Sequence, residues 1–472
     1  MTRSCVATAV AVVFSVSLQT APGWSQEPPE GTEAVEATEE TTADTERIRQ
    51  LEEELAKVRE EQGRLRQAVQ EIQKDEQAAP PPAQEPQKSP VKVGASVTVR
   101  YDSTELEDQT DLLLEDGEIE GLRTRVRLSV EYSPHQRVAA GVRISTGENP
   151  NPTSPFIRLG DAFRSKSFNL DQAYIVVRPL PAFDPLSVTL GKMPLPFWRG
   201  DRGSWRSELV WDDDVNPEGA IFQITIPGGS SLLQIENTAG YFIVNEVTDD
   251  RFAGLTGDTT LLADQLRLRV NAEAIGATLA AAIYDYNDLN AGLRAPNFTP
   301  GSGGFVAPGT SALLVREGLQ RTNNRVNFGP GADGFPDDRF TPVNLTAQVH
   351  IGLPFTGLAP EVFVLGDYVQ NLSVGQDDEG YGITAGLRGG GQGSVGAFNL
   401  WYTYRDVDAD ATLSTFTDSD LGGGTAYKGY EVGANYRFQP DLILQAVYLD
   451  FEGFPRKDNG VTRWFVDLVR TF

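Results

Sequence analysis

The stretch LRTRVRLSVEY, residues 122–132, constrains the fold of this chain more than any other part of the sequence. Its residues alternate between two unlike sets: Leu122, Thr124, Val126, Leu128, Val130 and Tyr132 on one side, and Arg123, Arg125, Arg127, Ser129 and Glu131 on the other. Alternation with a period of two is typical of a β-strand with one apolar and one polar face. Three arginines on one face require water or charged partners, so this strand must separate an apolar region from an aqueous one.

The same alternation recurs between Val91 and Phe472 and predicts sixteen strands. The predicted strands are 91–101, 122–132, 137–145, 167–178, 186–192, 216–226, 231–247, 263–275, 277–285, 342–351, 361–369, 380–388, 395–405, 428–438, 442–451 and 461–472. Short links such as 133–136 and 439–441 alternate with long ones such as 146–166 and 286–341. This alternation of short turns and long loops is typical of bacterial outer-membrane barrels. We therefore predict an all-β fold, a 16-stranded antiparallel transmembrane β-barrel preceded by a short N-terminal coiled-coil helix, with both barrel ends on the short-turn, periplasmic side.

The composition narrows the alternatives. The 472 residues include 66 Asp and Glu against 40 Lys and Arg, and the formal net charge of -26 argues against a nucleic-acid partner, whose phosphates require basic surface. No stretch after the N-terminus approaches the ~20 apolar residues of a membrane helix. Cys5 is the only cysteine, so disulfides and cysteine-bound metals are excluded from the mature chain, and we expect no metal or cofactor.

The region before the barrel divides into four segments. Residues 1–25 are expected to be a signal peptide, with Arg3 ahead of an apolar stretch and small residues before Gln26. Residues 26–46 are expected to be an acidic disordered segment, 47–77 a coiled coil, and 78–90 a proline-rich linker. The coiled-coil core would consist of Ile48, Leu51, Leu55, Val58, Gln62, Leu65, Val69 and Ile72. A single amphipathic helix packed on the rest of the chain is the alternative.

The chain ends RWFVDLVRTF, in which Trp464 and Phe472 share a face of an alternating strand. An aromatic C-terminal residue in this setting resembles the assembly signal of outer-membrane proteins, although Arg470 stands where an apolar residue is usual. With LDQAYIVVRP (170–179) and VTLGKMPLPFW (188–198), residues 91–472 resemble outer-membrane porins, including putative and phosphate-selective porins with an N-terminal periplasmic coiled coil. The resemblance implies a homotrimer in the outer membrane, surrounded by lipid and lipopolysaccharide and inserted by the barrel-assembly machinery.

In such a barrel the apolar face meets lipid and the other face lines a wet lumen. The predicted pore-lining arginines are Arg100, Arg123, Arg125, Arg127, Arg143, Arg267, Arg269, Arg388 and Arg437, which should make the wall net basic. A charge on the lipid side would cost ~2–4 kcal/mol at the bilayer midplane. Charges on the solvated face of a water-soluble sandwich are the remaining alternative.

Three acidic segments between predicted strands are candidates for functional loops. In related porins the third loop narrows the lumen, and here Asp212, Asp213, Asp214 and Glu218 are expected to form a constriction that faces the arginine wall across the lumen; a solvated extracellular loop is the equal alternative. Loop 102–120 carries nine acids and no base, which is expected to be solvated or bridged to lipid phosphates by divalent cations. Segment 406–417 begins like a calcium loop but lacks the required Gly and the final Glu, so no calcium site is expected.

The predicted function is a porin, a water-filled channel for passive diffusion of small hydrophilic solutes or ions with weak ion preference. The alternative is an envelope tether or adhesin that uses the coiled coil, with the barrel as its anchor. An enzyme is not expected, because the two histidines, His135 and His350, neighbour no recognisable nucleophile motif.

Overall fold

A computed structural model describes residues 89–472 with gaps, together with nine isolated helical positions between Arg49 and Gln67, all of them exposed. The gaps are 107–116, 148–151, 161, 181–184, 202–205, 228–231, 246–257, 273, 290–338, 354–359, 392, 421–423 and 454–459. The chain forms two compact units, Met1–Gln87 and Lys88–Phe472. The expected signal peptide, the acidic segment, nearly all of the linker and all eight coiled-coil core positions, Ile48 to Ile72, lie outside the described residues. No helix of the described part is long and apolar enough to cross a membrane.

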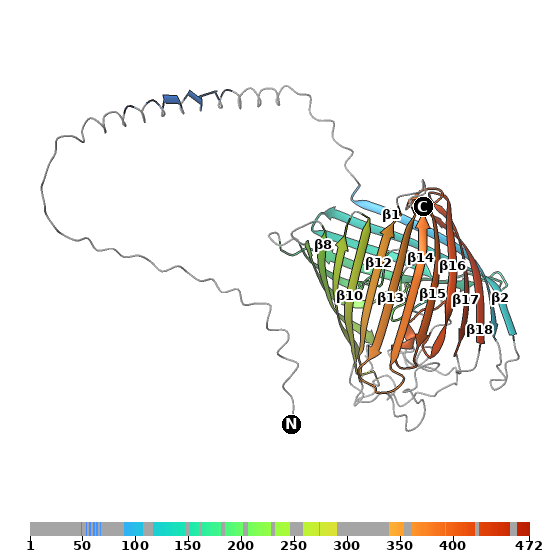
Figure 1. Ribbon diagram of the computed structural model, residues 1–472. Helices are drawn as coiled ribbons and strands as arrows, with labels where there is room; N and C mark the ends of the chain where they lie inside the picture. Colours follow the sequence, from blue (N-terminus) through green and yellow to red (C-terminus); the bar gives the residue numbers. More distant parts are fainter. Residues whose placement is uncertain are drawn as a thin grey trace, which may run out of the picture. The chain divides into compact units, whose positions relative to one another are not determined.

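The second unit is a closed antiparallel barrel (Figure 1). Its sixteen long strands are β1 (Val91–Leu106), β2 (Gly117–His135), β3 (Val138–Thr146), β5 (Phe168–Val177), β6 (Leu186–Lys192), β7 (Glu218–Pro227), β8 (Leu233–Asn245), β9 (Thr259–Asn271), β10 (Ile275–Asn287), β12 (Pro342–Gly352), β13 (Glu361–Asn371), β14 (Glu379–Gly389), β15 (Phe398–Val407), β16 (Tyr427–Gln439), β17 (Leu442–Glu452) and β18 (Gly460–Thr471). Each pairs with the next, and β1 pairs with β18, which closes the ring. The predicted 16-stranded barrel is confirmed.

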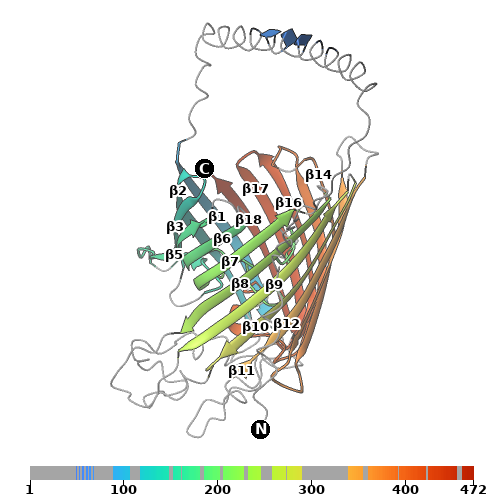
Figure 2. The same cartoon turned by 90° about the vertical axis from the view of Figure 1, so that its left-hand side faces the viewer.

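Two additional strands are only two residues long. β4 (Ile157–Arg158) continues the edge of β2 beyond β3, and β11 (Arg339–Phe340) pairs with β10 ahead of β12. A bulge in β5 leaves Asp171 as an extra residue between the partners of Arg143 and Ile144. The bulge allows two consecutive side chains, Asp171 and Gln172, to contact lumen residues. The strands of the barrel are inclined to its axis, as the tilt of β7–β10 shows (Figure 2).

The outer face of the barrel carries the apolar half of the alternation. Leu122, Leu128 and Val130 on β2 are 45–48% exposed, and the same class of exposed apolar side chain continues around β3, β5, β7–β10 and β12–β18. Near the C-terminus Trp464 is 39% exposed and its ring lies 5.4 Å from that of Tyr101, while Phe472 is 71% exposed and its backbone N–H donates to the carbonyl of Ala95. Such a surface is stable only against hydrocarbon.

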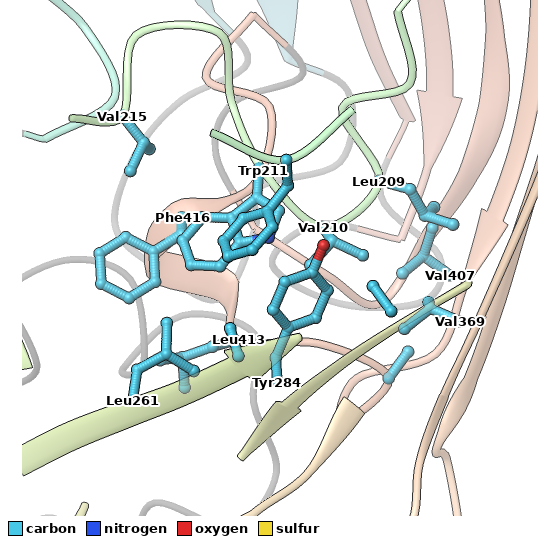
Figure 3. Close-up of a cluster of buried hydrophobic side chains, with 14 of the residues drawn as sticks. Leu209, Val210, Trp211, Val215, Leu261, Tyr284, Val369, Val407, Leu413 and Phe416 are labelled. Atoms are coloured by element: carbon cyan, nitrogen blue, oxygen red, sulfur yellow. The ribbon is translucent and has the colours of Figure 1, made fainter. Parts of the chain in front are cut away.

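The inner face is not polar all round. Beside buried polar residues such as Gln265 and Asp367, strands β8–β11 and β13 place large apolar side chains inward: Phe242, Leu261, Tyr284, Phe340 and Phe363, all at most 2% exposed. They form a core inside the barrel together with residues from two inserted segments, among them Trp211 and Phe416 (Figure 3). The same core explains why the prediction missed the first four residues of β9, which begins at Thr259. Leu261 faces the inner core and Leu262 faces outward, so both faces of the strand are apolar there and the sequence does not alternate.

We expect Leu266→Arg, in the middle of the outer face of β9, to lower the free energy of unfolding by roughly 2–4 kcal/mol, because an outward arginine must enter hydrocarbon. The matched control is Gln223→Arg, since Gln223 lines the lumen cavity. Urea titration of folding into lipid vesicles, followed by tryptophan fluorescence, is the measurement. Equal losses for the two variants would contradict the assignment of the faces.

Candidate functional site: the lumen of the barrel

Residues 193–201 and 206–217, between β6 and β7, enter the lumen. The backbone N–H of Trp198 donates to Gln265 Oε1 at 2.7 Å and that of Asp201 to Gln348 Oε1 at 2.8 Å. Ser207 donates its hydroxyl to the buried Asp367. Gln265, Gln348 and Asp367 are inward residues of β9, β12 and β13, so the loop follows the inner wall across these strands. We name residues 193–217 the first lumen segment.

A second segment, residues 408–420 between β15 and β16, also lies inside the barrel, and the sequence did not predict it. Ala411, Leu413 and Phe416 are at most 8% exposed, and the only helical turn here is η4 (Ser414–Phe416). The ring of Phe416 stacks on Trp211 of the first segment at 5.5 Å, and Asp212 N–H donates to the Phe416 carbonyl at 2.7 Å. We name residues 408–420 the second lumen segment.

The arginine wall of β1–β3 is paired with carboxylates. Arg100 is 4% exposed and donates to Asp467 at 2.7 Å and to Asp420 at 2.5 Å. Arg123 forms an ion pair with Asp102 at 3.0 Å. Arg127 pairs with Asp214, and Arg143 donates to Asp171 at 2.5 Å. Arg125 is the least neutralised of this group: its nearest carboxylate oxygen among the described residues, on Asp214, is 3.5 Å away.

The other predicted arginines lie apart from this wall. Arg267 pairs with Glu236 of β8 at 2.6 Å, and Arg269 approaches Asp201 of the first lumen segment at 3.5 Å. Arg388 pairs with Glu361 of β13 at 2.5 Å. Arg437, at the end of β16, donates to the carbonyl of Pro440 in the turn that follows. The structure therefore brings together the arginines of β1–β3 and distributes the remaining four around the ring.

The four predicted constriction carboxylates do not act as one group. Asp214 touches Arg127 directly, so these charges are not opposed across a water gap as expected. Asp213 pairs with Arg199 and Arg206 of its own segment, and Asp212 accepts from the backbone N–H groups of Asp214 and Ser419. Glu218 is the first residue of β7 and pairs with Lys192 of β6 at 2.7 Å rather than with an arginine of the wall that it was expected to face. Asp214 therefore attaches the first lumen segment to the arginine wall, and Asp212 attaches it to the second lumen segment.

Between the wall and the two lumen segments lies a cavity of about 780 Å³. Its charged lining residues are Arg100, Arg125, Arg127, Arg143, Arg199, Arg206, Arg267 and Arg405 on the basic side and Glu208, Asp212, Asp213, Asp214, Glu236, Asp418, Asp420, Glu431 and Asp467 on the acidic side. On the strands alone, six arginines of this lining stand against three carboxylates, Glu236, Glu431 and Asp467, and the carboxylates of the two lumen segments bring the whole lining close to balance. Both positive and negative groups border the same aqueous space.

Burial and neighbouring charges shift the pKa values of the carboxylates of the two segments in different directions. Burial, together with Asp418, Asp213 and Asp212, raises the pKa of Glu208 well above its ordinary value. Burial, Asp214 and Asp418 likewise raise the pKa of Asp212. Burial would also raise the pKa of Asp420, but Arg100 and Arg463 outweigh it and lower that pKa to about 2. The arginines thus stabilise the charged form of Asp420, whereas burial and neighbouring carboxylates destabilise the charged forms of Glu208 and Asp212.

Glu208, Asp212 and Asp418 are the carboxylates of the described residues grouped closely enough to hold a metal ion, with ligand atoms within 4.8 Å of one another. The oxygens of Asp212 and Asp418 are already used, since they accept from Asp214, Ser419, Asp420 and Arg405. Hydrogen bonds within and between the two segments and from Arg405 therefore hold these two carboxylates in place.

Several residues important to the lumen were missed in the sequence. Asp102 was assigned to a solvated acidic loop, yet β1 continues to Leu106 and Asp102 is fully buried between Arg123 and Arg463. Asp418 and Asp420 lay in an unassigned loop. The sequence did contain a sign that part of the chain fills the barrel. Residues 277–286, ATLAAAIYDY, are largely apolar on both faces, so the inner face must be covered by other residues of the chain.

We expect Glu208→Gln to raise the midpoint of thermal unfolding in detergent at about pH 8 and to leave it nearly unchanged at about pH 4. Because the pKa of Glu208 is raised in the folded state, its protonated form contributes to folding stability, and this contribution is fully present below the ordinary pKa of glutamate. The contribution is lost as the pH rises through the folded-state pKa. Glutamine remains neutral throughout. Circular-dichroism melts provide the measurement, and Glu452→Gln, at an exposed ion pair with Lys428, is the control. The same shift at both pH values would show that charge is not the cause.

Comparison with known proteins agrees with this geometry. A family model described as putative porin matches residues 57–472. No curated protein matches the chain. Among solved structures, the chain is similar to OprB of Pseudomonas putida (9% identity, 81% of this chain and 94% of that one, TM-score 0.49) and to OmpF of Salmonella typhi (9%, 81% and 97%, 0.45). It is also similar to a mutant porin of Rh. blastica (14%, 81% and 100%, 0.40). Because the family model covers most of the sequence, this chain belongs to the putative porin family, whose members are outer-membrane β-barrel channels for passive diffusion.

Proposed function

We propose that this porin carries small hydrophilic solutes and ions with only weak preference for charge, through the passage between the arginine wall of β1–β3 and the two lumen segments. The observation that supports the proposal is the cavity of about 780 Å³ inside the closed ring, lined by both positive and negative side chains. Solutes would move down their concentration gradients, and the protein would supply a polar path and a local field. The proposal includes no catalytic step and no cofactor.

Weak charge preference follows from the pairing of the charges. An arginine in contact with a carboxylate presents little net field to a passing ion, and Arg100, Arg127 and Arg143 each have such a partner at 2.7 Å or less. Arg125 is the exception, because Asp214 is 3.5 Å from it and is shared with Arg127. Its side chain is 23% exposed and borders the cavity. We therefore assign to Arg125 the main basic contribution to ion preference.

We expect Arg125→Gln to shift the reversal potential of single channels toward cations, with the cation-to-anion permeability ratio rising about twofold. The measurement is made in planar bilayers under a salt gradient. Arg339→Gln is the matched control, because Arg339 pairs with Asp285 and its side chain is 54% exposed away from the cavity. An unchanged reversal potential for Arg125→Gln would exclude this side chain from the limiting section, and an absence of conductance in the natural protein would refute the channel itself.

We further propose the cellular arrangement implied by the sequence: export through the predicted signal peptide, a periplasmic coiled coil, insertion by the barrel-assembly machinery through Trp464 and Phe472, and contact with lipid and lipopolysaccharide. A homotrimer is supported by the heptads and by β6, which has seven residues, fewer than the ~9–11 of a strand that spans lipid alone. A second copy would cover the short part of the wall. Native mass measured in detergent tests this, and a monomeric mass would refute it.

A further inference from the structure

The second lumen segment joins opposite sides of the barrel. The ring of Phe416 in this segment stacks on the ring of Tyr286 of β10, with centroids 6.4 Å apart and planes inclined by 12°. Four residues later, Asp420 forms ion pairs with Arg100 of β1 at 2.5 Å and with Arg463 of β18 at 3.6 Å. Around the ring, β10 is separated from β1 by seven strands and from β18 by six. The segment therefore crosses the lumen rather than following its wall.

The crossing is fixed along its whole length. Near its start, the backbone N–H of Asp410 donates to Asp377 at 2.7 Å, and the Asn371 side chain donates to the Asp410 carbonyl at 2.9 Å. Toward its end, Asp418 accepts from Arg405 of β15 at 2.5 Å. Side chains of β13, β15, β1 and β18 therefore hold the thirteen residues of this segment. A solvated loop would not need so many contacts.

The charge cluster at the end of the segment makes Asp420 the decisive contact. Arg100 and Arg463 are 4% and 7% exposed, and buried guanidinium groups are costly without carboxylate partners. Asp467 and Asp102 supply one partner to each, and Asp420 bridges the two arginines across the β1–β18 seam. Removal of its charge would break the ion pairs of the segment with Arg100 and Arg463, while these arginines would keep their strand partners.

We propose that residues 408–420 form a second constriction segment, latched to the seam of the barrel by Asp420, and that this segment limits the passage jointly with residues 193–217. The inference deepens the proposed channel function and rests on it. Both segments border the same cavity, which Asp418, Ser419 and Asp420 line on one side and Asp212, Asp213 and Asp214 on another. Solutes would pass between the two segments and the arginine wall, and the second segment would set the size limit.

Two variants test the latch by single-channel conductance in planar bilayers. Asp420→Asn should give a larger conductance or frequent transitions to a larger level, and replacement of residues 409–420 by a short glycine-serine linker should raise conductance about twofold, since conductance follows the open cross-section. The matched control is Asp441→Asn, at an exposed pair with Arg470 in a periplasmic turn. Only inserted, folded barrels contribute single-channel steps, so misfolded protein does not mimic either result.

A third variant leaves the latch intact. The chain has one cysteine, Cys5, within the predicted signal peptide, so Ser419→Cys places a single thiol in the cavity lining of the mature protein. A bulky cationic thiol reagent should reduce its conductance by more than half and leave the natural protein unaffected. If the natural protein conducts but none of the three variants behaves as expected, the second constriction is refuted while the channel function stands. If the natural protein does not conduct, the channel proposal itself fails.

Discussion

The pairing of β1 with β18 is the interaction on which the rest of this structure depends. It runs without interruption from Ser96 opposite Thr471 to Leu106 opposite Val461 and leaves no open edge in the ring. In hydrocarbon an unpaired backbone amide costs several kcal/mol, so a sheet can span a membrane only when it closes. Closure gives every strand an inner and an outer face, and the alternation in each strand then decides which side chains meet lipid and which meet the lumen.

Closure also creates an interior that must be filled. A sixteen-stranded ring is wide enough for water, and here part of that width is occupied by the two lumen segments and by an apolar core centred on Trp211 and Phe416. Apolar inward residues of β8–β11 and β13, such as Phe242 and Tyr284, pack in this core, whereas Arg100, Arg125, Arg127 and Arg143 of β1–β3 border the cavity of about 780 Å³. The lumen thus contains both an apolar core and a charged cavity, and the passage proposed above runs through the charged cavity.

Charge holds the division in place. The arginines of the wall have carboxylate partners: aspartates of the two segments contact Arg100, Arg125 and Arg127. Aspartates of the strands contact Arg123 and Arg143. Charges removed from bulk water need partners of opposite sign, and here the partners arrive from loops that are distant in sequence. The same ion pairs therefore position the segments and weaken the field of the wall, which connects the architecture of the lumen to the low charge preference proposed for it.

The sequence by itself determined the barrel: period-two alternation, an even number of segments and short turns at one end fix the strands, their faces and the inward direction of Arg123, Arg125 and Arg127, because these features depend on neighbours in the chain. It did not determine the partners of those arginines. Asp102 was read as part of a solvated loop, Asp214 as an opposing charge rather than a contact, and Asp418 and Asp420 were not assigned at all. Only the tertiary structure decided which loops enter the lumen and which carboxylates they carry to the wall. Those contacts join residues far apart in the chain, 320 positions for Arg100–Asp420 and 87 for Arg127–Asp214, and leave no local period in the sequence.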